Sequence, residues 1–222
     1  MAALLLSALI AWPSAQPQRL PVTPAAPFIT PLTVAEMANK QAVVETTAGS
    51  FVIDLRPDLA PNHVGYFMKL AREGAYANTM FHRVVRDAII QGGDPLSKDP
   101  SKAAQVRTGG MGILQAEHSG EAFTRGAVGA ALRPGQADSG GAQFFVCVTE
   151  QPVLKDQFTL FGRVSEGIDI VQKISELPAD AKGAPETRVT ITSVTVIGCH
   201  RGQAADHCEG MNERGRCIAP AH

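Results

Sequence analysis

Residues 80–95 contain the two polar side chains best placed to do chemistry, Arg83 and Gln91. They stand eight residues apart among apolar neighbours, in Met-Phe-His-Arg-Val-Val-Arg-Asp-Ala-Ile-Ile-Gln-Gly-Gly-Asp-Pro. Residue types alternate around Arg83, which predicts a strand, and the two glycines after Gln91 mark a positive φ or a close backbone approach. A guanidinium is permanently charged and carries a rigid fork of donors, so it can stabilise charge on a bound group. The alternative is that Arg83 forms half of a salt bridge on the sheet surface.

Other kinds of catalytic centre leave no trace in the sequence. It contains no Gly-x-Ser-x-Gly, His-Glu-x-x-His, Walker or dinucleotide-binding glycine pattern, so we expect no cofactor and no metal at a catalytic site. The formal net charge of −1 is spread over 222 residues without a basic stripe. This distribution argues against a nucleic-acid partner.

The periodicity of the apolar residues predicts a mainly β domain with two helices. The chain has 21 glycines and is therefore rich in turns, which favours strands over a helical bundle. Around Arg83, alternation places Phe81, Arg83 and Val85 on one side of the strand and His82 and Val84 on the other. We expect a closed antiparallel eight-stranded barrel capped by two α-helices. The expected strands are 42–47, 51–55, 81–85, 88–91, 127–132, 143–148, 158–164 and 188–197. One expected helix begins at Asp58 or Ala60 and ends at Gly74, and the other is 167–177.

Four short blocks in register resemble the signature of the cyclophilins, a family of peptidyl-prolyl cis-trans isomerases. They are Phe-His-Arg-Val-Val (81–85), Ile-Gln-Gly-Gly-Asp (90–94), Gln-Phe-Phe (143–145) and Phe-Gly-Arg-Val (161–164). The resemblance covers about residues 41–197, and the segment 92–100 is similar to the bacterial branch. It implies a cyclophilin-like barrel and catalysis of rotation about Xaa-Pro bonds.

The resemblance also implies roles for individual residues. It makes Arg83 the catalytic cation and Gln91 the group that orients it and holds the peptide. The residues implied to bind substrate are Phe81, Ala88, Ile89, Leu132, Arg133, Phe145, Leu154 and Phe158. The expected partners are proline-containing polypeptides, bound by a monomer that needs no cofactor.

The chain departs from the family pattern on the wall of the expected proline pocket. Ala88 stands where most cyclophilins have a phenylalanine, and Arg86-Asp87 replaces a usual Pro-Gly. Val153 stands where some members have tryptophan. These departures support an alternative hypothesis, a catalytically weak proline-peptide-binding module or chaperone on the same fold.

Both ends of the chain lie outside the expected isomerase domain, 39–198. Residues 1–15 are mostly apolar and too few to span a bilayer, which is typical of a signal peptide or N-terminal anchor; a buried helix is the alternative. Residues 16–38 form a proline-rich linker. We therefore expect a periplasmic or otherwise exported protein, with a membrane tether through the N-terminus if the segment is retained.

The tail, residues 199–222, carries three evenly spaced cysteines. Cys199, Cys208 and Cys217 are too far apart for the usual Cys-x2–4-Cys metal pairs, so a disulfide among them is preferred to a zinc site. Cys147 lies in an apolar strand, which predicts a buried thiol.

Overall fold

The computed structural model of the chain describes residues 26–198. The expected signal peptide or anchor, the first part of the linker and the three tail cysteines lie outside this range. Among residues 26–198, no helix is long and apolar enough to cross a membrane.

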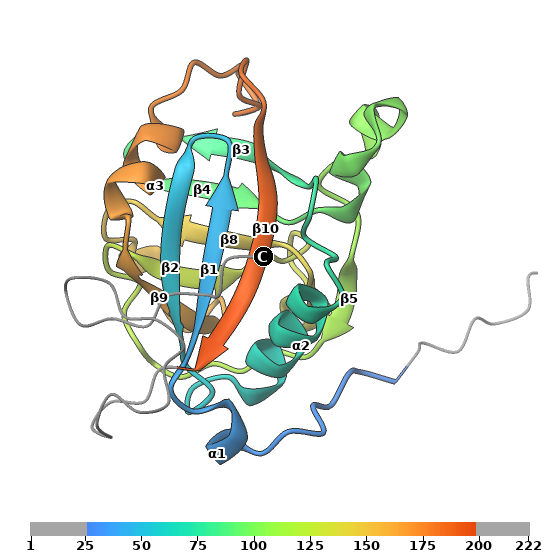
Figure 1. The fold of residues 1–222 in the computed structure, drawn as a ribbon, viewed down its shortest axis with the longest axis vertical. Helices are drawn as coiled ribbons and strands as arrows, with labels where there is room; N and C mark the ends of the chain where they lie inside the picture. Colours follow the sequence, from blue (N-terminus) through green and yellow to red (C-terminus); the bar gives the residue numbers. More distant parts are fainter. Residues whose placement is uncertain (1–25, 199–222) are drawn as a thin grey trace, which may run out of the picture.

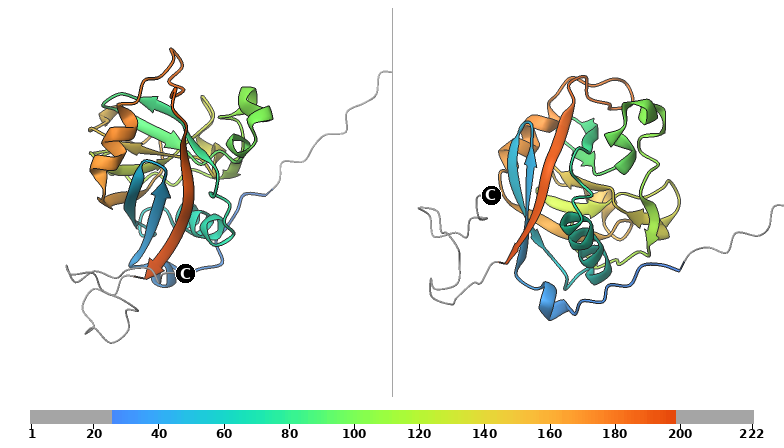
Figure 2. Two further views of the ribbon diagram at one scale, coloured as in Figure 1. Left: turned by 45° about the horizontal axis from the view of Figure 1, so that its top comes forward. Right: turned by 45° about the vertical axis from the view of Figure 1, so that its right-hand side comes forward.

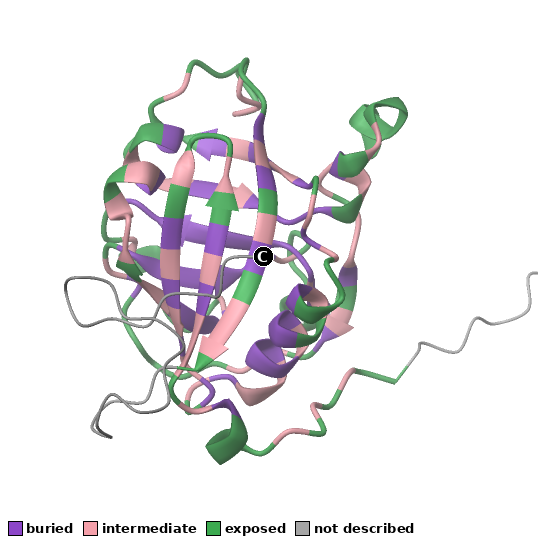
Figure 3. Cartoon of the chain, in the orientation of Figure 1, coloured by how far each residue is buried: buried purple, intermediate pink, exposed green. Residues whose placement is uncertain are grey.

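Eight antiparallel strands form a closed barrel, which confirms the predicted fold class (Figure 1). They are β1 (Lys40–Thr46), β2 (Gly49–Leu55), β3 (Met80–Val85), β4 (Ile89–Gly92), β6 (Ala127–Ala130), β8 (Phe144–Cys147), β9 (Leu160–Glu166) and β10 (Val189–Gly198). Around the barrel their order is β1-β10-β3-β4-β8-β6-β9-β2. Burial alternates along β1 and β2, because successive side chains of a strand point to opposite faces (Figure 3).

Two amphipathic helices, α2 (Pro61–Arg72) and α3 (Ile168–Ser175), cover the barrel at different ends (Figures 1 and 2). Proline suits the first turn of α2, where its missing N–H has no intrahelical partner to lose. The carboxylate of Glu117, from a distant loop, accepts the main-chain N–H groups of Asn62 and His63, each at 3.0 Å, and so caps this helix. Ile170 of α3 packs against the turn between β1 and β2.

Aromatic rings fill the main core, and a smaller cluster lies on the other side of the same strands. In the main core the ring of Phe67 on α2 lies 5.8 Å from that of Phe144 and 5.5 Å from that of Phe161. The next residue, Phe145, faces the opposite side of β8. There it belongs to the second cluster, which consists of Phe123, Ala127, Phe145, Cys147 and Leu160.

The N-terminal segment packs on the domain before the expected boundary at residue 39. The N–H of Phe28 donates to the carbonyl of Ile113 at 2.8 Å, and the N–H of Thr30 donates to Asn62 Oδ1 at 2.9 Å. Met37, at the end of a short helix, is fully buried in the main core. The packed body therefore includes the last residues of the expected linker.

The described loops contain several further short elements. The long connection between β4 and β6 includes a strand that pairs outside the barrel with a second short strand. These elements are α1 (Val34–Met37), β5 (Met111–Leu114), β7 (Gly140–Gly141), and 3-10 helices at Pro95–Lys98, Pro100–Gln105, Ala137–Ser139 and Pro152–Leu154.

Candidate active site

An irregularity in β3 aims Arg83 away from the core. Phe81 is opposite Gly92 on β4, but Arg83 is opposite Gln91, so two steps along β3 match one step along β4. Such a bulge breaks the alternation of side chains. Phe81 and Arg83 therefore do not share a face of the strand, although strict alternation of side chains predicts that they do.

Phe81 lies outside the groove that contains Arg83. Its side chain is fully buried, and its ring lies 6.1 Å from that of Phe144 in the main core. The expectation that Phe81 contacts substrate is therefore not supported by its position. The bulge is the physical reason, because it turns the ring inward.

Arg83 is a half-buried cation that has no counter-ion in the described part of the chain. Among residues 26–198, no hydrogen bond or ion pair uses its guanidinium, so the predicted alternative of a surface salt bridge is not found. Burial, and then the positive charge of Arg107, lowers the pKa of Arg83 from its ordinary value. An arginine nevertheless stays charged in a protein. Its charge is free to interact with a bound molecule.

A pocket of about 380 Å³ opens beside Arg83. It is lined by Arg83, Val85, Ala88, Ile89, Gln91, Ala131, Leu132, Phe145, Gln151, Leu154 and Phe158. The ring of Phe145 forms part of its apolar surface and is held between Phe123, at 5.7 Å, and Phe158, at 5.5 Å. Among the described residues, the pocket thus combines an apolar floor with one cation and two amides, and no acid lines it.

The pocket brings together eight of the ten residues expected at the site. They are Arg83, Gln91, Ala88, Ile89, Leu132, Phe145, Leu154 and Phe158. Three lining residues were missed: Val85, Ala131 and Gln151. Val85 shares a face with Arg83 by alternation, which could have identified it, whereas Gln151 follows β8 in a loop without any periodic signal.

Arg133, the other expected residue that does not line the pocket, is engaged elsewhere. Its N–H donates to Ser139 Oγ at 2.7 Å, and its carbonyl accepts the N–H of Gln136 at 3.0 Å. Its guanidinium donates to the carbonyl of Met111 at 3.2 Å. The preceding residue differs, because no described residue bonds to the main-chain N–H or carbonyl of Leu132. Leu132 therefore offers a free donor and a free acceptor at the pocket edge.

The turn that carries Ala88 is anchored to α3. Asp87 has a φ of +55°, a conformation that favours the glycine usual in the family. Arg86 donates to the carbonyl of Glu176 at 2.7 Å, at the end of α3, and Gln172 Nε2 donates to Asp87 Oδ1 at 2.9 Å. These bonds hold Arg86-Asp87 in a turn that a Pro-Gly pair would form without help.

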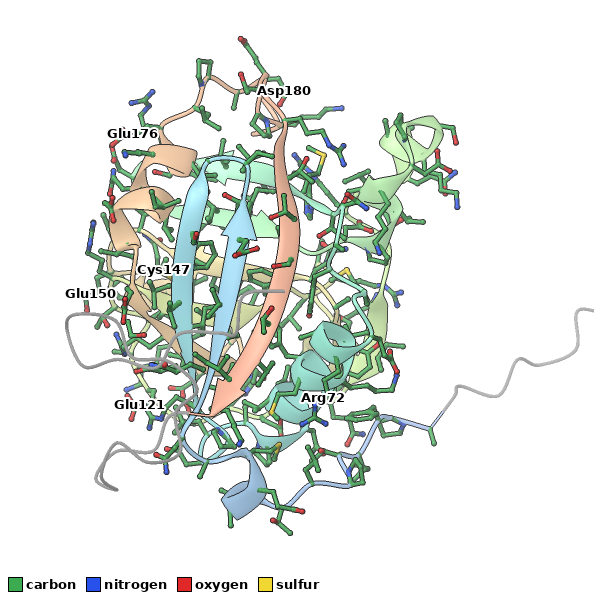
Figure 4. The ribbon with its side chains drawn as sticks, in the orientation of Figure 1. Arg72, Glu121, Cys147, Glu150, Glu176 and Asp180 are labelled. Atoms are coloured by element: carbon green, nitrogen blue, oxygen red, sulfur yellow. The ribbon has the colours of Figure 1, made fainter. Side chains whose placement is uncertain are left out.

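Cys147 packs beneath the pocket but has no nucleophilic character. It lies among the strands, whereas Glu121, Glu150 and Glu176 lie at the periphery (Figure 4). Burial raises the pKa of the Cys147 thiol to about 12, so the reactive thiolate is scarce. Over the part of the chain that the structure describes, no group of three or more His, Cys, Asp and Glu side chains could hold a metal ion.

A second pocket, of about 360 Å³, lies near the start of β1, and acids and cations both line it. Arg56 forms an ion pair with Asp58 at 2.6 Å, and Gln41 Nε2 donates to Asp54 at 2.7 Å. These side chains satisfy one another. Asp54 and Asp58 place acids beside the cations of this second pocket, whereas no acid is among the described residues that line the pocket beside Arg83, which is therefore the stronger candidate for chemistry.

The arrangement around Arg83 suits a reaction in which charge develops on a bound neutral group. A fixed cation at the edge of an apolar pocket interacts weakly with a planar amide and strongly with an amide nitrogen that has regained its lone pair. Twisting an amide bond produces that lone pair, because conjugation is lost.

Comparisons with known proteins agree with this geometry. Residues 42–196 match the family described as "Cyclophilin type peptidyl-prolyl cis-trans isomerase/CLD". A "Probable peptidyl-prolyl cis-trans isomerase" of Brucella suis is 39% identical over 159 residues, which cover 69% of this chain and 81% of that protein. A "Peptidyl-prolyl cis-trans isomerase-like 1" of Neurospora crassa is 33% identical over 159 residues, covering 69% and 92%.

Among solved structures, the barrel is similar to that of a cyclophilin-type isomerase of Cryptosporidium parvum, crystallised in the presence of the dipeptide Ala-Pro. The TM-score is 0.63 at 23% identity, covering 71% of this chain and 99% of the other. At this identity the likeness supports the fold. The family match extends over most of the described barrel and includes Arg83, Gln91 and Phe145. The chain belongs to the cyclophilin-type peptidyl-prolyl cis-trans isomerases.

Proposed function

We propose that the pocket beside Arg83 is where this isomerase binds proline-containing polypeptides and rotates the Xaa-Pro bond. The observation that carries the proposal is the unpaired Arg83 guanidinium at the edge of an apolar pocket of about 380 Å³. The size and the aromatic floor at Phe145 suit a proline ring.

The proposed mechanism uses differential binding of the twisted bond. Rotation is slow because the C–N bond has partial double-bond character, with a barrier of roughly 18–20 kcal/mol. At the twisted geometry, Arg83 donates to the prolyl nitrogen, whose lone pair has returned. The free main-chain groups of Leu132 pair with the peptide backbone, and the proline ring packs on Phe145. Each ~1.4 kcal/mol gained only in the twisted state raises the rate about tenfold.

The test compares three proteins in a prolyl-peptide isomerisation assay. Arg83→Ala should lower kcat by at least about tenfold with a smaller change in KM, since the interaction is made in the transition state. Arg83→Lys keeps the charge but loses the donor fork, and we expect an intermediate rate. Equal background rates for the wild type and Arg83→Ala would contradict the proposal.

A second candidate function, proline-peptide binding with little catalysis, is favoured by one observation. Ala88 is only half-buried on the pocket wall, and Val85, which also lines the pocket, is 36% exposed. A pocket wall that packs less closely would hold the proline ring of the substrate less rigidly. Peptide binding seen by NMR titration, together with no acceleration of exchange between cis and trans peptide, would support the binding module instead.

We further propose that the protein works on exported proteins, in the periplasm or otherwise outside the cytoplasm, and assists their folding. The apolar run in residues 1–15 and the proline-rich segment 16–38 support this proposal. Cell fractionation should find the protein outside the cytoplasm, and deletion of residues 2–15 should retain it inside. Mass spectrometry of the exported form distinguishes a cleaved signal peptide from a retained membrane tether. Light scattering tests the proposed monomer.

For the tail we propose one disulfide among Cys199, Cys208 and Cys217. Export to an oxidising compartment and the even spacing of these residues support it. Peptide mass mapping with and without reductant should identify a linked pair. A tail that binds zinc stoichiometrically in its reduced form would favour the metal site instead.

A further inference from the structure

A chain of hydrogen bonds leads from the pocket into the protein through Gln91. Gln91 Nε2 donates to Gln143 Oε1 at 3.2 Å, and Gln143 Nε2 donates to Asp94 Oδ2 at 3.1 Å and to the carbonyl of Gly109 at 2.8 Å. Asp94 and Gln143 are buried, at 0% and 1% exposure. Neither residue lines the pocket. The hydrogen bond between Gln143 and Gln91 connects them to the pocket.

The acceptors around Gln143 allow only one orientation of its amide. Asp94 Oδ2 also accepts the main-chain N–H groups of Arg107 and Gly109, so this oxygen can only be an acceptor for Gln143. The carbonyl of Gly109 is likewise an obligatory acceptor. Both require the NH2 group of Gln143 on their side. Its oxygen must then point toward Gln91.

This orientation passes on to Gln91. Facing an oxygen, Gln91 has to present its NH2 group to Gln143, and its own Oε1 points the other way. No described residue donates to that oxygen. Arg83 stands opposite Gln91 in the pairing of β3 with β4, so the two side chains are cross-strand neighbours. If the Gln91 amide were reversed, its Oε1 would face Gln143 Oε1, and its NH2 group would point toward the Arg83 cation.

We propose that Asp94, acting through Gln143, is a positioning residue that holds the Gln91 carbonyl oxygen toward Arg83 and the bound peptide. The proposal rests on the proposed function of Arg83 and Gln91. The carboxylate of Asp94 is closely packed, because a Cβ at Gly109 would lie 2.3 Å from Asp94 Oδ1. The loop that follows β4 is thereby tied to the amide at the site.

The first test is a double-mutant cycle. Gln143→Met removes the hydrogen bonds that link Asp94 to Gln91 through Gln143, here called the relay, but keeps the side-chain length. Asp94 retains its three main-chain donors, from Leu96, Arg107 and Gly109. We expect kcat to fall about three- to tenfold, the effect of one lost hydrogen bond. In a Gln91→Ala background, Gln143→Met should have no further effect. Additive losses, or no loss from Gln143→Met alone, would overturn the proposal.

The second test separates the acceptor from the charge at Asp94. Asp94→Asn can keep an acceptor oxygen toward Gln143, so its kcat should stay within about twofold of the wild type, although its thermal stability falls. Asp94→Ala removes the acceptor and should reproduce the kcat of Gln143→Met. Equal losses in the Asn and Ala variants would refute the relay. If Asp94→Ala does not fold, Asp94→Asn and the double-mutant cycle of Gln143 and Gln91 still test the proposal.

Side-chain amide NMR gives a readout that does not depend on activity. In the wild type, the NH2 protons of Gln91 and Gln143 should be protected from solvent exchange. Gln143→Met should remove the protection at Gln91, whereas Asp94→Asn should preserve it. An unprotected Gln91 amide in the wild type would contradict the proposed hydrogen bonding through Gln143. An inactive wild type with a protected Gln91 amide would instead contradict the proposed function, and the hydrogen-bonded orientation of Gln91 would still be supported.

Discussion

Acid should destabilise this protein through one buried histidine, His82. Its ring is 2% exposed, and neither ring nitrogen has a hydrogen-bond partner among the described residues. Burial lowers the pKa of His82 to about 4. Asp94 acts in the opposite direction, and the cations Arg107 and Arg83 lower the pKa further. The folded protein therefore keeps His82 neutral at a pH where the unfolded chain binds a proton.

The two pKa values set the size and the pH range of the effect. The pKa is 6.5 in the unfolded reference and about 4 in the fold, and ~1.4 kcal/mol per pKa unit gives about 3 kcal/mol. Because the folded pKa is the lower one, this stability is fully present above pH 6.5. It decreases as the pH falls toward about 4, where His82 becomes protonated in the fold as well. Stability should therefore rise with pH across this interval.

The assay is urea unfolding at pH 7 and pH 4 for the wild type and His82→Gln. We expect the wild type to lose about 3 kcal/mol more than the variant between the two pH values. Glu117 also contributes: burial raises its pKa, but the hydrogen bonds from His63 and Asn62 and the charge of His63 together lower it below its ordinary value, and this effect is common to both proteins. The control is His118→Gln at an exposed histidine, which should behave as the wild type. The same loss in the wild type and His82→Gln would refute the reasoning.

Three further predictions concern packing. Ala88→Phe rebuilds the pocket wall and should lower KM for prolyl peptides about fivefold, measured by steady-state kinetics; an unchanged KM would show that the ring binds elsewhere. Gly65→Ala would put a Cβ 2.1 Å from Thr30 Oγ1, so chymotrypsin should cleave at Phe28 faster than in the wild type. Adding Thr30→Gly should reverse this change. In a variant whose tail cysteines are replaced by serine, Cys147 should react with a thiol reagent only after unfolding; rapid labelling of the native protein would contradict its burial.

The barrel could be predicted because its strands carry either alternation, as in β1 and β2, or a short apolar run, as in β8, and turn residues separate them. The hairpin of β1 and β2 and the apolar strand β8 lie close to their expected ranges. The packing of Phe28 and Met37 could not be predicted, because proline-rich sequence carries no period. That packing depends on partners far along the chain, such as Asn62 and Ile113.

At the site, the sequence identified most of the residues but not how they are aimed. Strict alternation puts Phe81 beside Arg83, and a bulge, which has no signal in these residue types, separates them. The main-chain bonds that withdraw Arg133 and leave Leu132 free are equally invisible in the sequence. The family motif supplied what the periodicity could not, namely that Arg83 faces a groove.

The bulge and the buried carboxylate together explain why Arg83 keeps its charge available. Asp94 is the acid that follows the same motif, but it forms no ion pair with Arg83 and does not line the pocket. Both oxygens instead accept from fixed donors, the N–H groups of Leu96, Arg107 and Gly109 and the amide of Gln143. Burial and the charge of Arg107 lower the pKa of Arg83, and no acid among the described residues acts in the opposite direction. A cation that is held in place but left unpaired can interact most strongly with the lone pair of a twisting prolyl bond.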